Sequence, residues 1–136
     1  MTSIELSNWI KKCEGYRQYP YMDMTKQITI GYGRNLDAKG LSPEESEMLL
    51  ANDIADTKLD LSSLFWYHYQ PLDVKDALTN MCFNLGLKRF LTFQKMISAL
   101  IVKDYAVAAK ECLDSKWAFE IGDRARDIAL MIREAK

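Results

Sequence analysis

The sequence has little of what interrupts or crosslinks a chain. Among its 136 residues are six glycines, three prolines, three cysteines and a single histidine. Cys13, Cys82 and Cys112 are odd in number and form no Cys-x-x-Cys pair, so we expect structural thiols in a reducing compartment and not a disulfide framework. His68 alone leaves too few ligands for zinc, which usually takes roughly three or four from the protein. We therefore expect no metal and no cofactor.

The sequence also lacks long apolar runs and an excess of one charge. No apolar run approaches the roughly 18 residues of a membrane span. The N-terminal segment lacks the basic-then-apolar order of a signal peptide, so we expect a protein made in the cytoplasm without membrane insertion. Lys and Arg total 18 against 19 Asp and Glu, a net charge of −1, which argues against a nucleic-acid binder that relies on bulk positive charge.

Apolar residues, by contrast, are plentiful. They make up 49% of the chain and aromatics 11%, too much for a disordered protein. A chain of this length buries roughly two thirds of its unfolded surface, enough for a core without crosslinks. We expect one domain over residues 1–136, and we expect it to be a monomer.

Local patterns predict one small β region among helices. Residues 3–13 have amphipathic spacing, with Ser3 as a cap and Gly15 as a stop. Residues 16–35 are rich in strand formers, and two strands around a turn at 24–26 predict a hairpin. Within 27–32, Ile28, Ile30 and Tyr32 alternate with polar or small residues, so Thr29 lies on the opposite face.

The remainder of the sequence predicts helices. Ser42, Pro43 and Glu45 form a capping box that starts a helix running to about Leu61. Beyond Pro71, helical spacing recurs up to the C-terminus, with Asp123 as a cap for the last helix. The predicted fold class is α+β and mostly helical. The predicted helical stretches contain Val74 to Leu85, Phe93 to Leu100, Tyr105 to Cys112 and Ala125 to Ile132.

The polar groups suited to acid/base chemistry concentrate where the first helix meets the hairpin. Glu14 ends that helix, Asp23 lies at the turn, and Thr29 lies on the second strand. Two carboxylates in different surroundings can divide the roles of acid and base, and glycosidic cleavage needs that pair of roles. Since the chain has 19 acidic residues, a pair of carboxylates is not diagnostic by itself.

The spacing of these residues resembles the phage-type lysozymes, the endolysins of glycoside hydrolase family 24. Glu14-Gly15 is followed by a Tyr-rich segment, by Asp23 nine residues after the Glu, and by a Thr-Ile-Gly-x-Gly strand that begins at Thr29. The resemblance covers residues 5 to about 133. Its later parts are Phe83-Asn84-Leu85-Gly86, Tyr105 to Ala109, Ser115-Lys116-Trp117 and Asp123-Arg124-Ala125-Arg126.

The resemblance implies a lysozyme-like fold of two lobes that hydrolyses the β-1,4 bond between N-acetylmuramic acid and N-acetylglucosamine in peptidoglycan. A hairpin lobe would span about 15–60, and a helical lobe would combine 1–13 with 61–136. Glu14 would be the general acid, Asp23 the base or electrostatic partner, and Thr29 would position water. The resemblance further implies substrate contacts at Asn35, Phe83 and Asn84, and an Arg124 that pairs with the catalytic Glu.

Two features depart from the family pattern. The turn between Asp23 and Thr29 lacks the usual Gly, so a tight hairpin must force a non-Gly residue toward positive φ or use another turn. Many relatives are strongly basic, whereas this chain is nearly neutral, so we expect its activity to depend less on salt.

Two alternatives remain open from the residues. A lytic transglycosylase on a related fold would need one acid and no water-activating Asp, and it would release a 1,6-anhydro product. A non-catalytic protein on the same fold would bind peptidoglycan without cleaving it. For the hydrolase, the resemblance implies release to the wall through a holin-type pore, with peptidoglycan as the partner.

Overall fold

The computed structural model describes all residues from 1 to 136. It contains nine α-helices, one 3₁₀ turn and a three-stranded antiparallel sheet, which confirms the predicted α+β, mostly helical class. Internal packing divides the chain into two compact units, Met1–Met48 and Leu49–Lys136. The predicted lobes differ from these two units, because they group residues 1–13 with the helical part. That grouping stays a prediction.

The N-terminal unit begins with helix α1, Ser3–Glu14. Its N-cap is Thr2 and not the predicted Ser3, because the Thr2 hydroxyl accepts the Glu5 amide at 3.1 Å while the Glu5 carboxylate accepts the Thr2 amide at 3.0 Å. Gly15 ends the helix at φ +71°, as its position predicted.

The sheet of this unit has the order β1-β2-β3, with β1 at Arg17–Met22, β2 at Ile28–Gly31 and β3 at Arg34–Asn35. The first two strands confirm the predicted hairpin. The pairing shifts register between Arg17 and Tyr21. Pro20, which cannot donate to a ladder, lies inside this irregular stretch of an edge strand, where it is tolerated.

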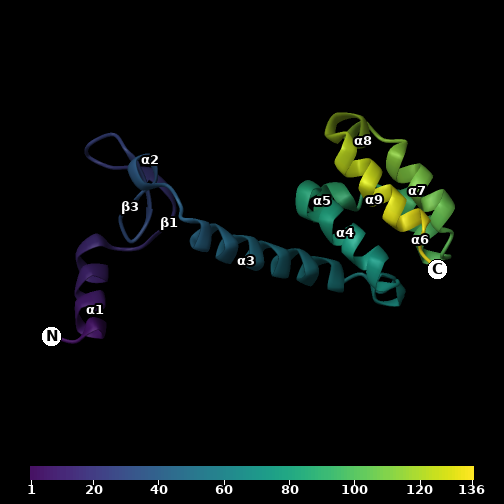
Figure 1. Cartoon of the computed structure of the whole chain (residues 1–136). Helices are drawn as coiled ribbons and strands as arrows, with labels where there is room; N and C mark the ends of the chain where they lie inside the picture. The colour runs from purple at the N-terminus through teal and green to yellow at the C-terminus, as the bar shows by residue number, and fades with distance from the viewer. The chain divides into compact units, whose positions relative to one another are not determined.

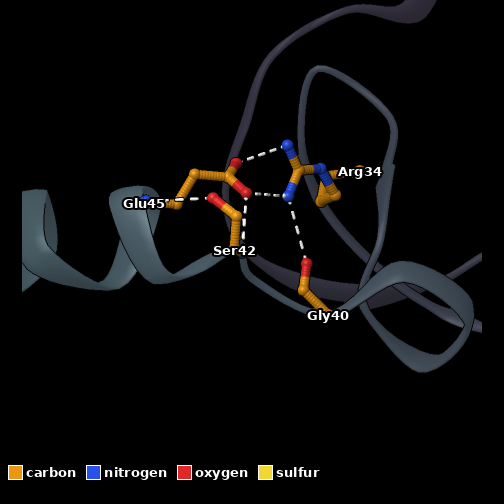
Figure 2. A network of polar contacts seen from close by, with 4 residues as sticks. All are labelled: Arg34, Gly40, Ser42 and Glu45. Carbon is orange, nitrogen blue, oxygen red and sulfur yellow. Dashed lines mark hydrogen bonds and ion pairs between the residues drawn. The ribbon is translucent and has the colours of Figure 1, made fainter.

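Helix α2, Leu36–Lys39, and strand β3 were not predicted. A polar network then connects β3 to helix α3, Pro43–Ser62 (Figure 2). The Arg34 guanidinium donates to the Gly40 carbonyl at 3.0 Å and pairs with both carboxylate oxygens of Glu45. Glu45 and Ser42 form the predicted capping box, with the Glu45 amide 3.1 Å from the Ser42 hydroxyl oxygen and the Ser42 amide 2.9 Å from the Glu45 carboxylate.

The helical unit confirms the periodic stretches of the sequence (Figure 1). One detail is wrong: Asp123 is the first residue of α9, and its N-cap is Gly122 at φ +71°. After α3 come η1 at Tyr67–Tyr69, α4 at Leu72–Leu85, α5 at Leu87–Phe90, α6 at Gln94–Ile101, α7 at Tyr105–Leu113, α8 at Lys116–Ile121 and α9 at Asp123–Arg133.

The apolar core lies in this helical unit, where α4, α6, α7 and α9 pack together. Trp66 and Tyr67 are buried in it, whereas Phe65 and Tyr69 of the same aromatic run are exposed. The buried Gln70 amide donates to the carbonyls of Trp66 and Leu100 and accepts the Tyr105 hydroxyl at 2.9 Å. The largest fully buried side chains are Phe90, Leu61, Leu78, Met81, Met96, Leu100 and Ile132.

No helix has the combination of length and apolar character that crossing a membrane requires. Helix α3, at 20 residues, is the longest, but its sequence is interrupted throughout by acidic side chains.

Candidate active site

The carboxylate of Asp23 organises the hairpin turn. Its Oδ1 accepts hydrogen bonds from the Thr25 amide at 2.8 Å, the Thr25 hydroxyl at 2.7 Å and the Gln27 amide at 2.9 Å. The Asp23 amide and carbonyl pair with Gln27 and Lys26 across the turn. The side chain therefore adds its own hydrogen bonds to the backbone pairing of the turn, in the manner of an Asx turn.

This environment favours the ionised form of Asp23. The hydrogen bonds from the Gln27 amide and the Thr25 hydroxyl lower the pKa of Asp23 below its ordinary value of 3.8. The carboxylate is therefore ionised at neutral pH. Such a group can orient water or stabilise positive charge, but it cannot donate a proton as a general acid.

The turn adopts the strained alternative that its lack of Gly predicted. Lys26 has φ +63°, one of only two non-Gly residues of the chain at positive φ. Left-handed backbone costs a residue with a Cβ about 1–2 kcal/mol. The hydrogen bonds of the Asp23 carboxylate oppose that cost, because they tie down the residues on both sides of Lys26.

Thr29 is the single buried residue of the N-terminal unit, at 4% exposure, and lies beside Asp23. Its hydroxyl oxygen is 3.4 Å from Asp23 Oδ2 and 3.2 Å from the Gln27 carbonyl oxygen. Because a hydroxyl carries one proton, it can donate to only one of these acceptors at a time. Both separations exceed the usual length of such a bond, so the hydroxyl can also turn toward a third partner.

Glu14 ends α1 in the same unit and is exposed. Within this unit its carboxylate makes no hydrogen bond or ion pair, and it lies against the backbone at Gly33. A Cβ placed on Gly33 would be only 2.6 Å from Glu14 Oε2. The N-terminal unit thus contains all three predicted catalytic residues: Asp23 next to Thr29, and Glu14 next to Gly33.

Asn35, predicted to contact sugar, has a structural task in this unit. Its Oδ1 accepts the Ala38 amide at 2.9 Å as the N-cap of α2, and its Nδ2 donates to the side-chain oxygen of Gln27. Both ends of the amide are therefore engaged within the protein, and a sugar contact stays a prediction.

The other predicted residues belong to the helical unit. Phe83 and Arg124 line a groove of about 350 Å³ together with Asn80 and Thr79. The Arg124 guanidinium donates to the Asn80 side-chain oxygen at 2.8 Å and to the Asn80 carbonyl at 3.3 Å. Its pairing with Glu14, which lies in the other unit, stays a prediction.

Asn84 lies one residue after Phe83 on α4 and is exposed. Its side-chain oxygen accepts the indole N–H of the buried Trp117 at 2.8 Å, which ties α4 to α8. The Asn84 Nδ2 group is not used in that bond and is available to a ligand. The substrate contacts predicted at Phe83 and Asn84 stay predictions.

The structure shows no cluster of metal-ligating side chains, and two of its three cysteines are buried. No group of three or more His, Cys, Asp or Glu side chains lies close enough together to hold a metal ion. Burial raises the pKa of Cys82 and of Cys112 to about 11, so both remain thiols at neutral pH and are poor nucleophiles.

Sequence reasoning missed the residues that support Asp23. Thr25 and Gln27 hold its carboxylate, and only the spacing Asp-x-Thr, which is typical of an Asx turn, could have indicated Thr25. It also missed the Arg34–Glu45 pair (Figure 2), which joins residues 11 positions apart. A capping box already explained Glu45, so its second partner had no signature in the sequence.

Comparison with known proteins assigns the chain to a family. Residues 11–136 match the family model described as phage lysozyme, so the chain belongs to the phage lysozyme family. It is also 29% identical over 110 residues to "Probable T4-type lysozyme 1" of Dictyostelium discoideum, a match that covers 76% of this chain. The match spans 65% of the length of that relative.

Proposed function

We propose that this protein is a muramidase that hydrolyses the β-1,4 bond between N-acetylmuramic acid and N-acetylglucosamine in bacterial peptidoglycan. The observation that carries the proposal is the Asp23–Thr29 pair, an ionised carboxylate with a hydroxyl 3.4 Å away, in the same unit as Glu14. Membership of the phage lysozyme family supports this function for the site.

The surroundings of the two carboxylates divide their roles. Asp23 is held ionised by its donors, which suits the base that orients water or the group that stabilises an oxocarbenium-like transition state. Glu14 is the other carboxylate that the family spacing singles out in this unit, so it takes the role of the acid that protonates the leaving oxygen. Thr29 would hold the attacking water, since its hydroxyl already lies beside Asp23.

The test is a product analysis of the wild type and of Glu14→Gln, with soluble peptidoglycan fragments as substrate. The wild type should release fragments with a free reducing end, and Glu14→Gln should lose nearly all activity because an amide cannot donate the proton. Glu44→Gln is the matched control, since Glu44 is an exposed glutamate in the first turn of α3 without a side-chain hydrogen bond.

Each alternative has its own outcome in this experiment. A 1,6-anhydro product would identify a lytic transglycosylase, and binding without cleavage would identify a peptidoglycan-binding protein. Full activity of Glu14→Gln would show that the acid is assigned wrongly. The route to the wall, release through a holin-type pore, stays a prediction.

A further inference from the structure

Gly33 is the one glycine of this chain whose missing side chain leaves space that another side chain uses. It follows β2 at φ +76°. A Cβ built on Gly33 would lie 2.6 Å from Oε2, 3.0 Å from Cδ and 3.4 Å from Cγ of Glu14. Real Cβ atoms do not approach an oxygen so closely. The Glu14 carboxylate therefore occupies the position that any other residue at 33 would fill.

No hydrogen bond or ion pair within the N-terminal unit fixes the Glu14 side chain. Glu14 ends α1, is exposed, and makes no hydrogen bond or ion pair in its unit. An exposed glutamate without partners samples several rotamers, each of which places the carboxylate elsewhere. In the structure the carboxylate packs closely against Gly33, and that contact restricts the positions it can take.

Gly31 is a control that separates the effect of the Glu14 contact from the effect of backbone strain. It is two residues away in the same segment and has φ +67°, yet a Cβ on Gly31 would meet nothing within 4 Å. Replacing either glycine by Ala forces a side chain into left-handed backbone. Only the change at Gly33 also pushes against Glu14, and the atoms in its way belong to the movable end of a side chain.

We propose that Gly33 is a positioning residue, which makes room for the Glu14 carboxylate and thereby aims the general acid at the glycosidic oxygen. The inference rests on the proposed function, because it concerns the acid of that reaction. Positioning errors of about 1 Å can lower a rate by about 100-fold. A Cβ at Gly33 requires a shift of that size at Oε2.

The activity test compares Gly33→Ala with Gly31→Ala on soluble peptidoglycan fragments. We expect Gly33→Ala to lower kcat by about 100-fold with KM nearly unchanged, and Gly31→Ala to lower it only a few-fold. The melting temperatures of both variants should fall by a similar amount, because each variant places an Ala at positive φ. Combined with Glu14→Asp, which shortens the acid by one methylene, Gly33→Ala should lower kcat by less than it does alone. Equal kcat values for the two alanine variants would overturn the proposal.

A second measurement does not depend on activity. In the folded wild type, the Glu14 Hγ protons and a Gly33 Hα proton should give a strong nuclear Overhauser effect. Its absence would overturn the proposed contact whatever the kinetics show. If it is present while Glu14→Gln retains full activity, then the contact stands and the proposed function of Glu14 fails, and the positioning role falls with it.

Discussion

Each of the two units of the chain is stabilised internally by a different kind of contact. Every buried apolar side chain belongs to the helical unit, whereas the N-terminal unit buries a single residue, Thr29. The N-terminal unit relies instead on polar contacts: the Asp23 turn, the Arg34–Glu45 pair and the helix caps. Because an apolar core is insensitive to pH while paired carboxylates are not, the two units should respond differently to the same perturbation.

The largest expected effect is in the apolar unit. Phe90 is fully buried, and its ring stacks on Trp66 at 6.4 Å between centroids. Phe90→Ala should lower the free energy of unfolding by about 3–5 kcal/mol, because it leaves a cavity in the core. Urea denaturation followed by tryptophan fluorescence measures this, since Trp66 and Trp117 are both buried in the helical unit. A loss below about 1 kcal/mol would contradict the assignment of the core.

A smaller effect should follow from the hydrogen bonds of Gln70, which is buried in that core. Gln70→Met keeps the volume similar but leaves the carbonyls of Trp66 and Leu100 and the Tyr105 hydroxyl without their partner. The expected loss is about 1–3 kcal/mol in the same urea assay. Thr79→Ser is a control, because it keeps the hydroxyl that donates to the Lys75 carbonyl. A neutral Gln70→Met would contradict a stabilising role for the hydrogen bonds of Gln70.

The third prediction concerns pH and the N-terminal unit. The Arg34 guanidinium and the Ser42 donors lower the pKa of Glu45 from 4.5 to about 2. Because the folded pKa is depressed, this stabilisation is present above the unfolded pKa and is lost as pH falls from about 4.5 toward about 2. At one fixed urea concentration, the native NMR signals of the β2 amides should be weaker at about pH 3 than at about pH 6 in the wild type. In Glu45→Gln this difference between the two pH values should be much smaller.

The signals of α9 amides in the same samples are the internal control. The prediction fails if the α9 signals weaken at low pH as much as the β2 signals do and Glu45→Gln alters neither set. The Arg34–Glu45 network would then not make the N-terminal unit more sensitive to pH than the helical unit. The Asp23 carboxylate adds to the same trend, since its pKa is also lowered below the ordinary value.

The smallest expected change is a gain in stability. Lys26 has φ +63° in the turn, and Lys26→Gly should remove that strain. After the entropy cost of Gly, the gain should be about 0.5–1 kcal/mol. Thermal unfolding of Lys26→Gly beside Lys39→Gly separates the effects, because Lys39 lies in helix α2, where Gly is unfavourable. A loss of stability at position 26 would show that the Lys26 backbone is not strained.

Much of the fold follows from local patterns in the sequence. Helical spacing and the Ser42–Glu45 box predicted α3 and the later helices, since these features depend on neighbours within a few residues. The short elements β3 and α2 escaped prediction, because two strand residues and one helical turn carry no periodicity. The caps at Thr2 and Gly122 were missed because Ser3 and Asp123, one residue further on, are the more favoured N-cap residue types.

For the candidate site, the sequence alone determined which residues to consider. The Glu14, Asp23 and Thr29 spacing resembled a family, and the lack of a turn glycine left two options, a non-Gly residue at positive φ or another turn. The structure has the first of these, with Lys26 at φ +63°. Only the tertiary structure decided that Asp23 is held ionised by Thr25 and Gln27, and that Gly33 makes room for Glu14. The physical reason is that hydrogen bonds and close contacts depend on distances between atoms, which a residue pattern does not specify.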